Sequence, residues 1–220
     1  MNVSETVAAI DRDGFTILRN ACSAELVESL RASLPPVEGA GLRGLRMKQP
    51  IVDKVFLQPA IESTITAVLG DRYRCVRSIL FDKRPGSNWL VPPHRDMTIC
   101  VEKRIETAGF GPWSVKDGIP HVQPPDDILD RMLTIRLHLD KTTSDSGALR
   151  VWPGSHAKPD QDWDRAESVL CEAEAGDVLL MRPRIVHASS KSTLERPRRI
   201  VHLELAADEL PNGLCWYESA

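Results

Sequence analysis

A series of short, strand-like segments constrains this chain's fold more than any other feature. They begin near Tyr73, loops rich in Pro, Gly and Asp separate them, and no helical pattern lies between most of them. Such a series indicates a sandwich or jelly roll rather than a parallel α/β sheet. The predicted strands are residues 74–83, 97–102, 132–139, 148–152, 167–173, 177–182 and 198–206.

The first third of the chain has a different pattern, with helices around one short strand. We expect a single domain over residues 1–220, in which helices within about 1–70 pack on a β core of about 73–206. Residues 37–47 are rich in Gly and are expected to be irregular. The predicted elements are a short helix before a strand at 13–19, a helix over 24–34 capped by Ser23, and a helix over 59–69 that ends before Gly70.

Composition excludes several classes of protein. The net charge is −3 with no basic stripe, so a nucleic-acid partner is not expected. No apolar run is long enough for a membrane span, and the N-terminus does not resemble a secretory signal. The five cysteines are scattered and form no Cys-x-x-Cys pair, which fits a reducing cytoplasm. Oligomeric state leaves no signal in the sequence.

Two predicted strands carry an apolar and a polar face. Val201, Leu203 and Leu205 alternate with Arg198, Ile200, His202 and Glu204, and Ile135, Leu137 and Leu139 alternate with Thr134, Arg136, His138 and Asp140. A polar face usually meets solvent. Because His and Arg dominate here, where Lys and Glu are typical of a solvated face, we expect the reverse. The apolar faces then pack under the N-terminal helices and the polar faces line an internal site.

The triplet His94-Arg95-Asp96 and the later His187 have the composition of an iron site. Two imidazoles and one carboxylate can occupy one face of Fe(II) and leave the opposite positions open. A second triplet, His138-Leu139-Asp140, offers the same spacing. We favour His94 because it follows Pro-Pro at a loop edge, from which a side chain can approach a metal, whereas His138 lies inside an apolar strand.

An arginine distinguishes His187 from the other late histidines. Arg198 follows it across a loop, so a hairpin would place the two residues on adjacent strands. Guanidinium binds carboxylate in a bidentate fork, which suits a dicarboxylate co-substrate. His156 closes a Pro-Gly-Ser-His turn without an arginine at strand spacing beyond it, and no arginine follows His202. Together these residues indicate an iron- and 2-oxoglutarate-dependent oxygenase.

The motifs resemble those of the phytanoyl-CoA dioxygenase family over roughly residues 12–206. The matching pieces are Asp-Gly-Phe-Thr, Phe-Asp-Lys, Pro-Pro-His-Arg-Asp, Leu-His-Leu-Asp, Gly-Ala-Leu-Arg-Val-Trp-Pro-Gly-Ser-His, and Gly-Asp-Val-Leu-Leu-Met before His187. The resemblance implies a double-stranded β-helix (a cupin-like jelly roll) that uses Fe(II), 2-oxoglutarate and O₂ and releases succinate and CO₂. It assigns His94, Asp96 and His187 to iron, Arg198 to the distal carboxylate of 2-oxoglutarate, and Ser189 to a supporting hydrogen bond.

The chain also departs from the family pattern. Arg95 stands where Gln is common, and Arg136 stands where an aromatic residue is frequent. Arg136 lies on a predicted cavity wall, so we expect it to meet either 2-oxoglutarate or an anionic substrate. The alternative is an ion pair with Asp or Glu on an adjacent strand. The long segment 103–131 is expected to be a loop that acts as a lid or binding loop.

The resemblance implies hydroxylation of a small molecule. Related halogenases carry a small residue in place of Asp96, which leaves room for a halide. Desaturation, epimerisation and ring formation are other outcomes of the same chemistry. Two further alternatives are a cupin-like metal-binding or isomerase protein without oxygen chemistry, which would not require Arg198 and Ser189, and a non-catalytic family member.

Overall fold

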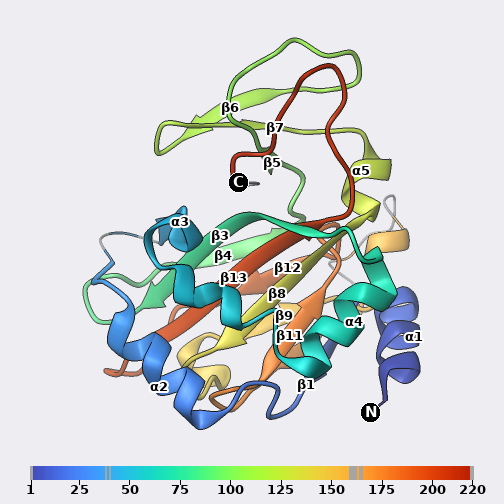
Figure 1. Ribbon diagram of the computed structural model, residues 1–220. Helices are drawn as coiled ribbons and strands as arrows, with labels where there is room; N and C mark the ends of the chain where they lie inside the picture. Colours follow the sequence, from blue (N-terminus) through green and yellow to red (C-terminus); the bar gives the residue numbers. More distant parts are fainter. Residues whose placement is uncertain (1, 38, 40, 159–162, 164–165, 219–220) are drawn as a thin grey trace.

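The largest element of the computed structural model, which describes residues 2–37, 39, 41–158, 163 and 166–218, is a six-stranded antiparallel sheet (Figure 1). Its strand order is β1-β11-β8-β13-β3-β2. The strands are β1 (Phe15–Leu18), β11 (Val178–Met181), β8 (Met132–His138), β13 (Arg198–Ala206), β3 (Arg74–Lys83) and β2 (Leu42–Arg43). The bounds of β3 and β13 coincide with those predicted from the sequence.

A second, four-stranded antiparallel sheet packs against the first. Its order is β10 (Val169–Cys171), β9 (Leu149–Val151), β12 (His187–Ser189) and β4 (Val91–His94). Leu149 and Val151 of this sheet share a buried cluster with Leu179 and Met181 of β11. One cavity is lined by residues of both sheets, so the predicted cupin-like jelly roll is confirmed. The strands β4 and β12 were not among those predicted, since both are short and β4 contains Pro-Pro. The predicted hairpin that would place His187 and Arg198 on adjacent strands is wrong, because β12 and β13 belong to different sheets and the two residues line the same cavity from opposite sides.

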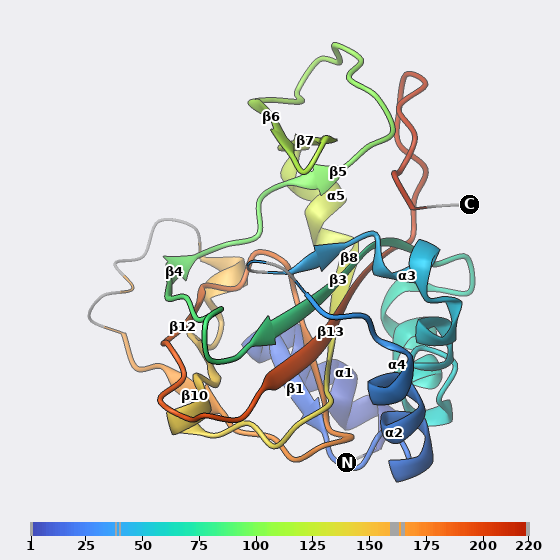
Figure 2. The same cartoon turned by 90° about the vertical axis from the view of Figure 1, so that its left-hand side faces the viewer.

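Helices cover the outer face of the six-stranded sheet (Figures 1 and 2). They are α1 (Val3–Asp13), α2 (Ala24–Ser33) and α4 (Pro59–Leu69). The apolar residues predicted for one face of β8 and β13 share a core with Ile10, Leu30 and Ile61 of these helices. The polar faces of the same strands therefore turn inward, as the abundance of His and Arg predicted.

The prediction of a loop over residues 103–131 is wrong. This segment contains β6 (Trp113–Lys116), β7 (Ile119–Val122) and α5 (Asp126–Asp130), and the two strands join β5 (Ile99–Cys100) in a third sheet. The hairpin turn is Asp117-Gly118, and both residues have positive φ, as a tight hairpin requires. The overlooked signal is this Asp-Gly pair between two short alternating segments.

The C-terminal segment contacts both the third sheet and the jelly roll. Figure 1 shows this segment in red beside β5. Trp216 is fully buried and forms an isolated β-bridge with Val101, the residue after β5. Its indole N–H donates to the Asp208 carbonyl at 2.8 Å. Glu218 then accepts a hydrogen bond from the Ser78 amide on β3 at 2.8 Å.

The segment 37–47 also differs from its prediction, because it includes β2 and the start of α3 (Leu45–Lys48). Three short 3₁₀ helices, η1 (Pro50–Lys54), η2 (Ser144–Ser146) and η3 (Ser155–Ala157), complete the described elements. Across the described part of the chain, every helix is too short or too polar to cross a bilayer.

Candidate active site

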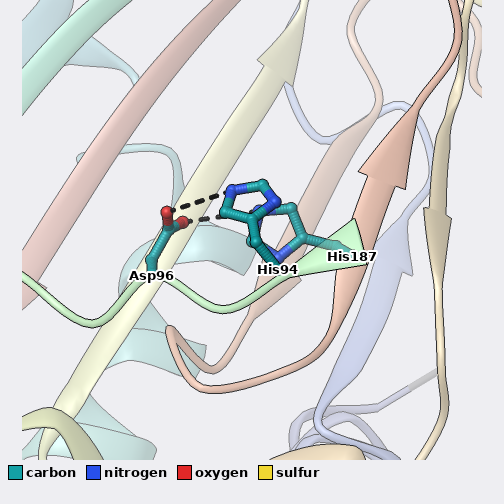
Figure 3. A group of neighbouring side chains, drawn as sticks. All are labelled: His94, Asp96 and His187. Atoms are coloured by element: carbon teal, nitrogen blue, oxygen red, sulfur yellow. Dashed lines mark ion pairs between the residues drawn. The ribbon is translucent and has the colours of Figure 1, made fainter. Parts of the chain in front are cut away.

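Strand pairing between β4 and β12 brings the predicted iron ligands together (Figure 3). His94 ends β4, His187 begins β12, and the two are register partners with ring centroids 4.3 Å apart. Asp96 follows β4, and its carboxylate oxygens lie 3.7 Å from His94 Nε2 and 3.6 Å from His187 Nε2. The three candidate ligand atoms lie within 4.8 Å of one another.

Backbone carbonyls set the tautomer of both histidines. His94 Nδ1 lies 2.9 Å from the Pro92 carbonyl, and His187 Nδ1 lies 2.9 Å from the Ile185 carbonyl. A carbonyl only accepts, so each Nδ1 carries the proton and each Nε2 presents a lone pair. With one carboxylate on the same side, this donor set fits a facially coordinated Fe(II).

The electrostatics also suit a metal. Burial lowers the pKa of His187 to about 4, so its ring is neutral and able to bind a metal at pH 7. The nearby Asp96 carboxylate stabilises a protonated imidazole and so raises the pKa of His94. Burial alone would raise the pKa of Asp96, but the neighbouring histidines hold it well below its usual range, so the carboxylate is ionised.

The second triplet lies elsewhere. His138 is buried with Nδ1 2.9 Å from the Thr142 hydroxyl, and burial lowers its pKa to about 3. Asp140 lies beyond the end of β8 and accepts two hydrogen bonds from the side chain of Arg199, at 2.8 and 2.9 Å. Among the described residues, neither belongs to a cluster that could hold a metal ion.

The other two late histidines have different partners. His156 Nε2 lies 3.2 Å from the Asp11 carbonyl on α1. His202 lies in the cavity, within 4.8 Å of Asp96 and Glu204, and these three could in principle hold an ion. However, Glu204 Oε1 already accepts from His202 Nε2 at 3.1 Å and from Arg77 at 3.0 Å. This group is a satisfied hydrogen-bond network.

A cluster of buried cations lies on the same cavity wall. Arg198 begins β13 and pairs in register with Lys83 at the end of β3. Lys83 is fully buried and donates to the Ser189 hydroxyl at 3.0 Å and to the Ser190 carbonyl at 2.6 Å. Arg198 is 2% exposed, and its Nε has no hydrogen-bond partner. Arg198, Lys83 and Ser189 therefore form a pocket ready for a carboxylate.

Burial and mutual repulsion destabilise the charged forms of these cations. Burial, followed by repulsion from Arg136, lowers the pKa of Arg198 to about 9. Burial and repulsion from Arg198 lower the pKa of Lys83 to about 7. An anion bound here would reverse both shifts. No role was predicted for Lys83. The signal that could have identified it is a lysine at the end of a strand whose residues are mostly buried.

Arg136 has a partner other than the one considered in the sequence. It lies on β8 and is 7% exposed, and its Nη1 donates to Nδ1 of His202 at 3.0 Å. The partner from the adjacent strand is thus a histidine and not Asp or Glu. The Phe81 ring lies 5.5 Å from the guanidinium carbon.

The candidate iron ligands, Arg136 and Arg198 share one cavity that opens in part to solvent, whereas the buried Lys83 reaches its edge through Ser189. The cavity wall combines the candidate iron ligands and these two arginines with apolar or aromatic side chains. The lining residues are Arg77, Ile79, Phe81, Trp89, Val91, His94, Asp96, Arg136, Leu149, His187, Ser189, Arg198, His202 and Glu204.

Comparison with known proteins identifies the family of this chain. The sequence model of phytanoyl-CoA dioxygenase (PhyH) matches residues 10–200. The chain belongs to the phytanoyl-CoA dioxygenase family. An "Iron/alpha-ketoglutarate-dependent dioxygenase ausU" of Aspergillus calidoustus is 27% identical over 236 residues, which cover 92% of this chain and 70% of that protein. As a family member, the chain is a non-haem iron oxygenase that depends on 2-oxoglutarate.

Solved structures of 2-oxoglutarate enzymes share the fold. The carbocyclase SnoK from nogalamycin biosynthesis superposes with a TM-score of 0.72 at 16% identity, covering 100% of this chain and 90% of that one. EctD from S. alaskensis, solved with 2-oxoglutarate and 5-hydroxyectoine, gives 0.69 at 18% identity, covering 93% and 76%. The predicted family and fold are both confirmed.

Proposed function

We propose that this phytanoyl-CoA dioxygenase family member hydroxylates an unactivated C–H bond of a small molecule. The observation that carries the proposal is a single cavity whose wall holds both a two-histidine, one-carboxylate face and two buried arginines, Arg136 and Arg198, which form no ion pair among the described residues. The first set fits Fe(II) and Arg198 fits a dicarboxylate, so metal and co-substrate can bind side by side.

In this proposal, each residue has a defined part. His94, Asp96 and His187 hold the iron, and the carbonyls at their Nδ1 atoms keep both rings oriented. Arg198 binds the distal carboxylate of 2-oxoglutarate, with Ser189 and Lys83 beside it. Iron bound with 2-oxoglutarate supplies O₂ activation, which couples decarboxylation to succinate and CO₂ with oxidation of the substrate. Asp96 occupies the position that a halide would need, which supports hydroxylation over halogenation.

Two finer points belong to the same proposal. Arg198 and Ser189 at the cavity wall favour oxygen chemistry over a cupin-like isomerase, which would not require them. A reducing cytoplasm is supported by the five free cysteines, four of them buried. Two enzymes of nogalamycin biosynthesis that share this fold, the carbocyclase SnoK and the epimerase SnoN, keep ring formation and epimerisation as other outcomes at the same site.

The test is anaerobic loading with Fe(II) and 2-oxoglutarate, followed by exposure to O₂ with a panel of small metabolites. We expect about one Fe(II) per chain, as a mononuclear facial triad requires, a weak visible charge-transfer band, and succinate formation that a substrate stimulates. His94→Ala and His187→Ala should each abolish the band and the bound iron. His138→Ala is the matched control, since it removes a buried histidine outside the site, and the band should persist. Loss of the band in His138→Ala with retention in His94→Ala would refute the assignment.

A further inference from the structure

A continuous chain of hydrogen bonds runs along the cavity wall across β8, β13 and β3. Arg136 donates to His202 Nδ1 at 3.0 Å, His202 Nε2 lies 3.1 Å from Glu204 Oε1, and Arg77 donates to the same oxygen at 3.0 Å. Guanidinium has donors only, so His202 Nδ1 must accept. Its proton is therefore on Nε2, where it is donated to Glu204, and the ring is neutral.

In this hydrogen-bond network, Arg77 has a carboxylate as its partner, whereas Arg136 has no counter-ion among the described residues. Glu204 forms its ion pair with Arg77. Arg136 has a neutral imidazole as its direct partner, and its buried Nε has no hydrogen-bond partner in the part of the chain that the structure describes. Burial lowers the pKa of Arg136, although Asp96 and Glu204 oppose the shift from a distance. A buried cation without a direct anion is unfavourable, so this position is expected to receive one.

Charge balance indicates which anion it is. In the loaded site, the two charges of Fe(II) are offset by Asp96 and by the metal-proximal carboxylate of 2-oxoglutarate. The distal carboxylate is offset by Arg198, with Lys83 beside it. Lys83 and Arg136 then remain as positive charges that neither cofactor neutralises. Lys83 lies outside the cavity lining and donates to Ser189 and Ser190, whereas Arg136 lines the cavity.

We infer that the substrate is a small anion, a carboxylate or a phosphate, and that Arg136 binds its charged group. The inference rests on the proposed function, because it assumes that iron and 2-oxoglutarate occupy the positions given above. The link through His202 to Glu204 and Arg77 holds the guanidinium in place, so Arg136 is a specificity-determining residue.

The experiment uses acetate and inorganic phosphate as probes. Protein loaded anaerobically with Fe(II) and saturating 2-oxoglutarate is titrated with each anion while the charge-transfer band is followed. We expect a saturable change in the wild type, at least tenfold weaker binding in Arg136→Gln, and partial retention in Arg136→Lys. Arg150→Gln is the control, because Arg150 is an exposed arginine on β9, and its titration should match the wild type.

Two further measurements separate the competing roles of Arg136. The half-saturating 2-oxoglutarate concentration should change less than threefold in Arg136→Gln, and an increase as large as that of Arg198→Ala would assign Arg136 to the co-substrate instead. The metal-free Arg136→Gln protein should melt no lower than the wild type, since it loses an uncompensated buried charge. A clearly lower melting temperature with unchanged anion binding would make Arg136 a structural residue.

Failure of the inference and failure of the proposed function give different results. If wild-type protein binds neither iron nor 2-oxoglutarate, the proposed function is wrong. If the band forms but neither anion changes it, or if Arg136→Gln responds as the wild type does, only the inference is overturned.

Discussion

At the scale of single residues, two adjacent arginines on β13 lie on opposite sides of the sheet and have different roles. Arg198 faces the cavity with an unpartnered Nε, whereas Arg199 makes a bidentate pair with Asp140 on the other side of the sheet. Arg198→Ala should raise the half-saturating 2-oxoglutarate concentration at least tenfold, because a hydrogen bond to a charged group contributes about 1.5–3 kcal/mol. Calorimetric titration of the iron-loaded protein under anaerobic conditions measures this.

Arg199→Ala is the matched control for that prediction. It should leave 2-oxoglutarate binding unchanged and lower the free energy of unfolding by about 1 kcal/mol, the loss expected for a partly exposed ion pair. Equal effects of the two substitutions on 2-oxoglutarate binding would refute the assignment of Arg198.

At the scale of elements, the turn between η2 and β9 supports the cation cluster. Gly147 in this turn has a φ of 73°, and a Cβ added there would lie 2.4 Å from the Ser190 carbonyl oxygen. That same oxygen accepts the hydrogen bond from Lys83. The glycine of the Ser-Gly-Ala-Leu motif therefore permits a close approach between two loops, which explains how a motif without a metal ligand supports the site.

Gly147→Ala should accordingly destabilise the fold and also weaken 2-oxoglutarate binding. We expect a loss of roughly 3 kcal/mol or more from backbone strain together with the steric clash. Gly118→Ala is the control, because its φ of 77° is similar and its Cβ would meet open space. It should cost about 1–2 kcal/mol, the strain of a left-handed residue, and leave 2-oxoglutarate binding intact. Urea unfolding and calorimetry on both variants test this, and equal effects would contradict it.

At the scale of the whole molecule, buried neutral histidines set the acid stability of the metal-free protein. Burial lowers the pKa of His121 to about 4 and that of His138 to about 3, from an ordinary 6.5. Above pH 6.5 neither folded nor unfolded chain binds these protons. Below it only the unfolded chain does, so stability falls with decreasing pH until the folded pKa is reached. Asp140, whose pKa is lowered, loses its contribution only at lower pH.

For each histidine, the unfolded chain binds up to one proton more than the folded chain. The unfolding free energy should therefore change by up to about 1.4 kcal/mol per pH unit for each histidine. His121→Gln should therefore flatten the dependence of the unfolding free energy on pH between 6 and 4.5, as measured by urea denaturation. An unchanged slope would contradict the prediction. The same curves test the single domain predicted for residues 1–220, which requires one cooperative transition.

Sequence patterns alone predicted five of the six strands of the larger sheet, the inward polar faces of β8 and β13, and the candidate ligands. These are local properties: alternation in β8 and β13, the spacing within His94-Arg95-Asp96, and Arg198 after His187. Local patterns failed for β4 and β12, whose strands consist of few residues and form only because each has a partner across the sheet.

Which distant residues come together at the site depends on how the strands pair and the sheets pack. The pairing of β3 with β13 brings Lys83 to Arg198, and the packing of the two sheets brings Lys83 to Ser189 on β12. The pairing of β8 with β13 brings Arg136 to His202. Sequence patterns cannot specify such partners, since a strand's alternation defines its faces but not its neighbours or register. The two histidines likewise lie together because β4 pairs with β12, which brings their candidate ligand atoms within 4.8 Å of each other and of the Asp96 carboxylate.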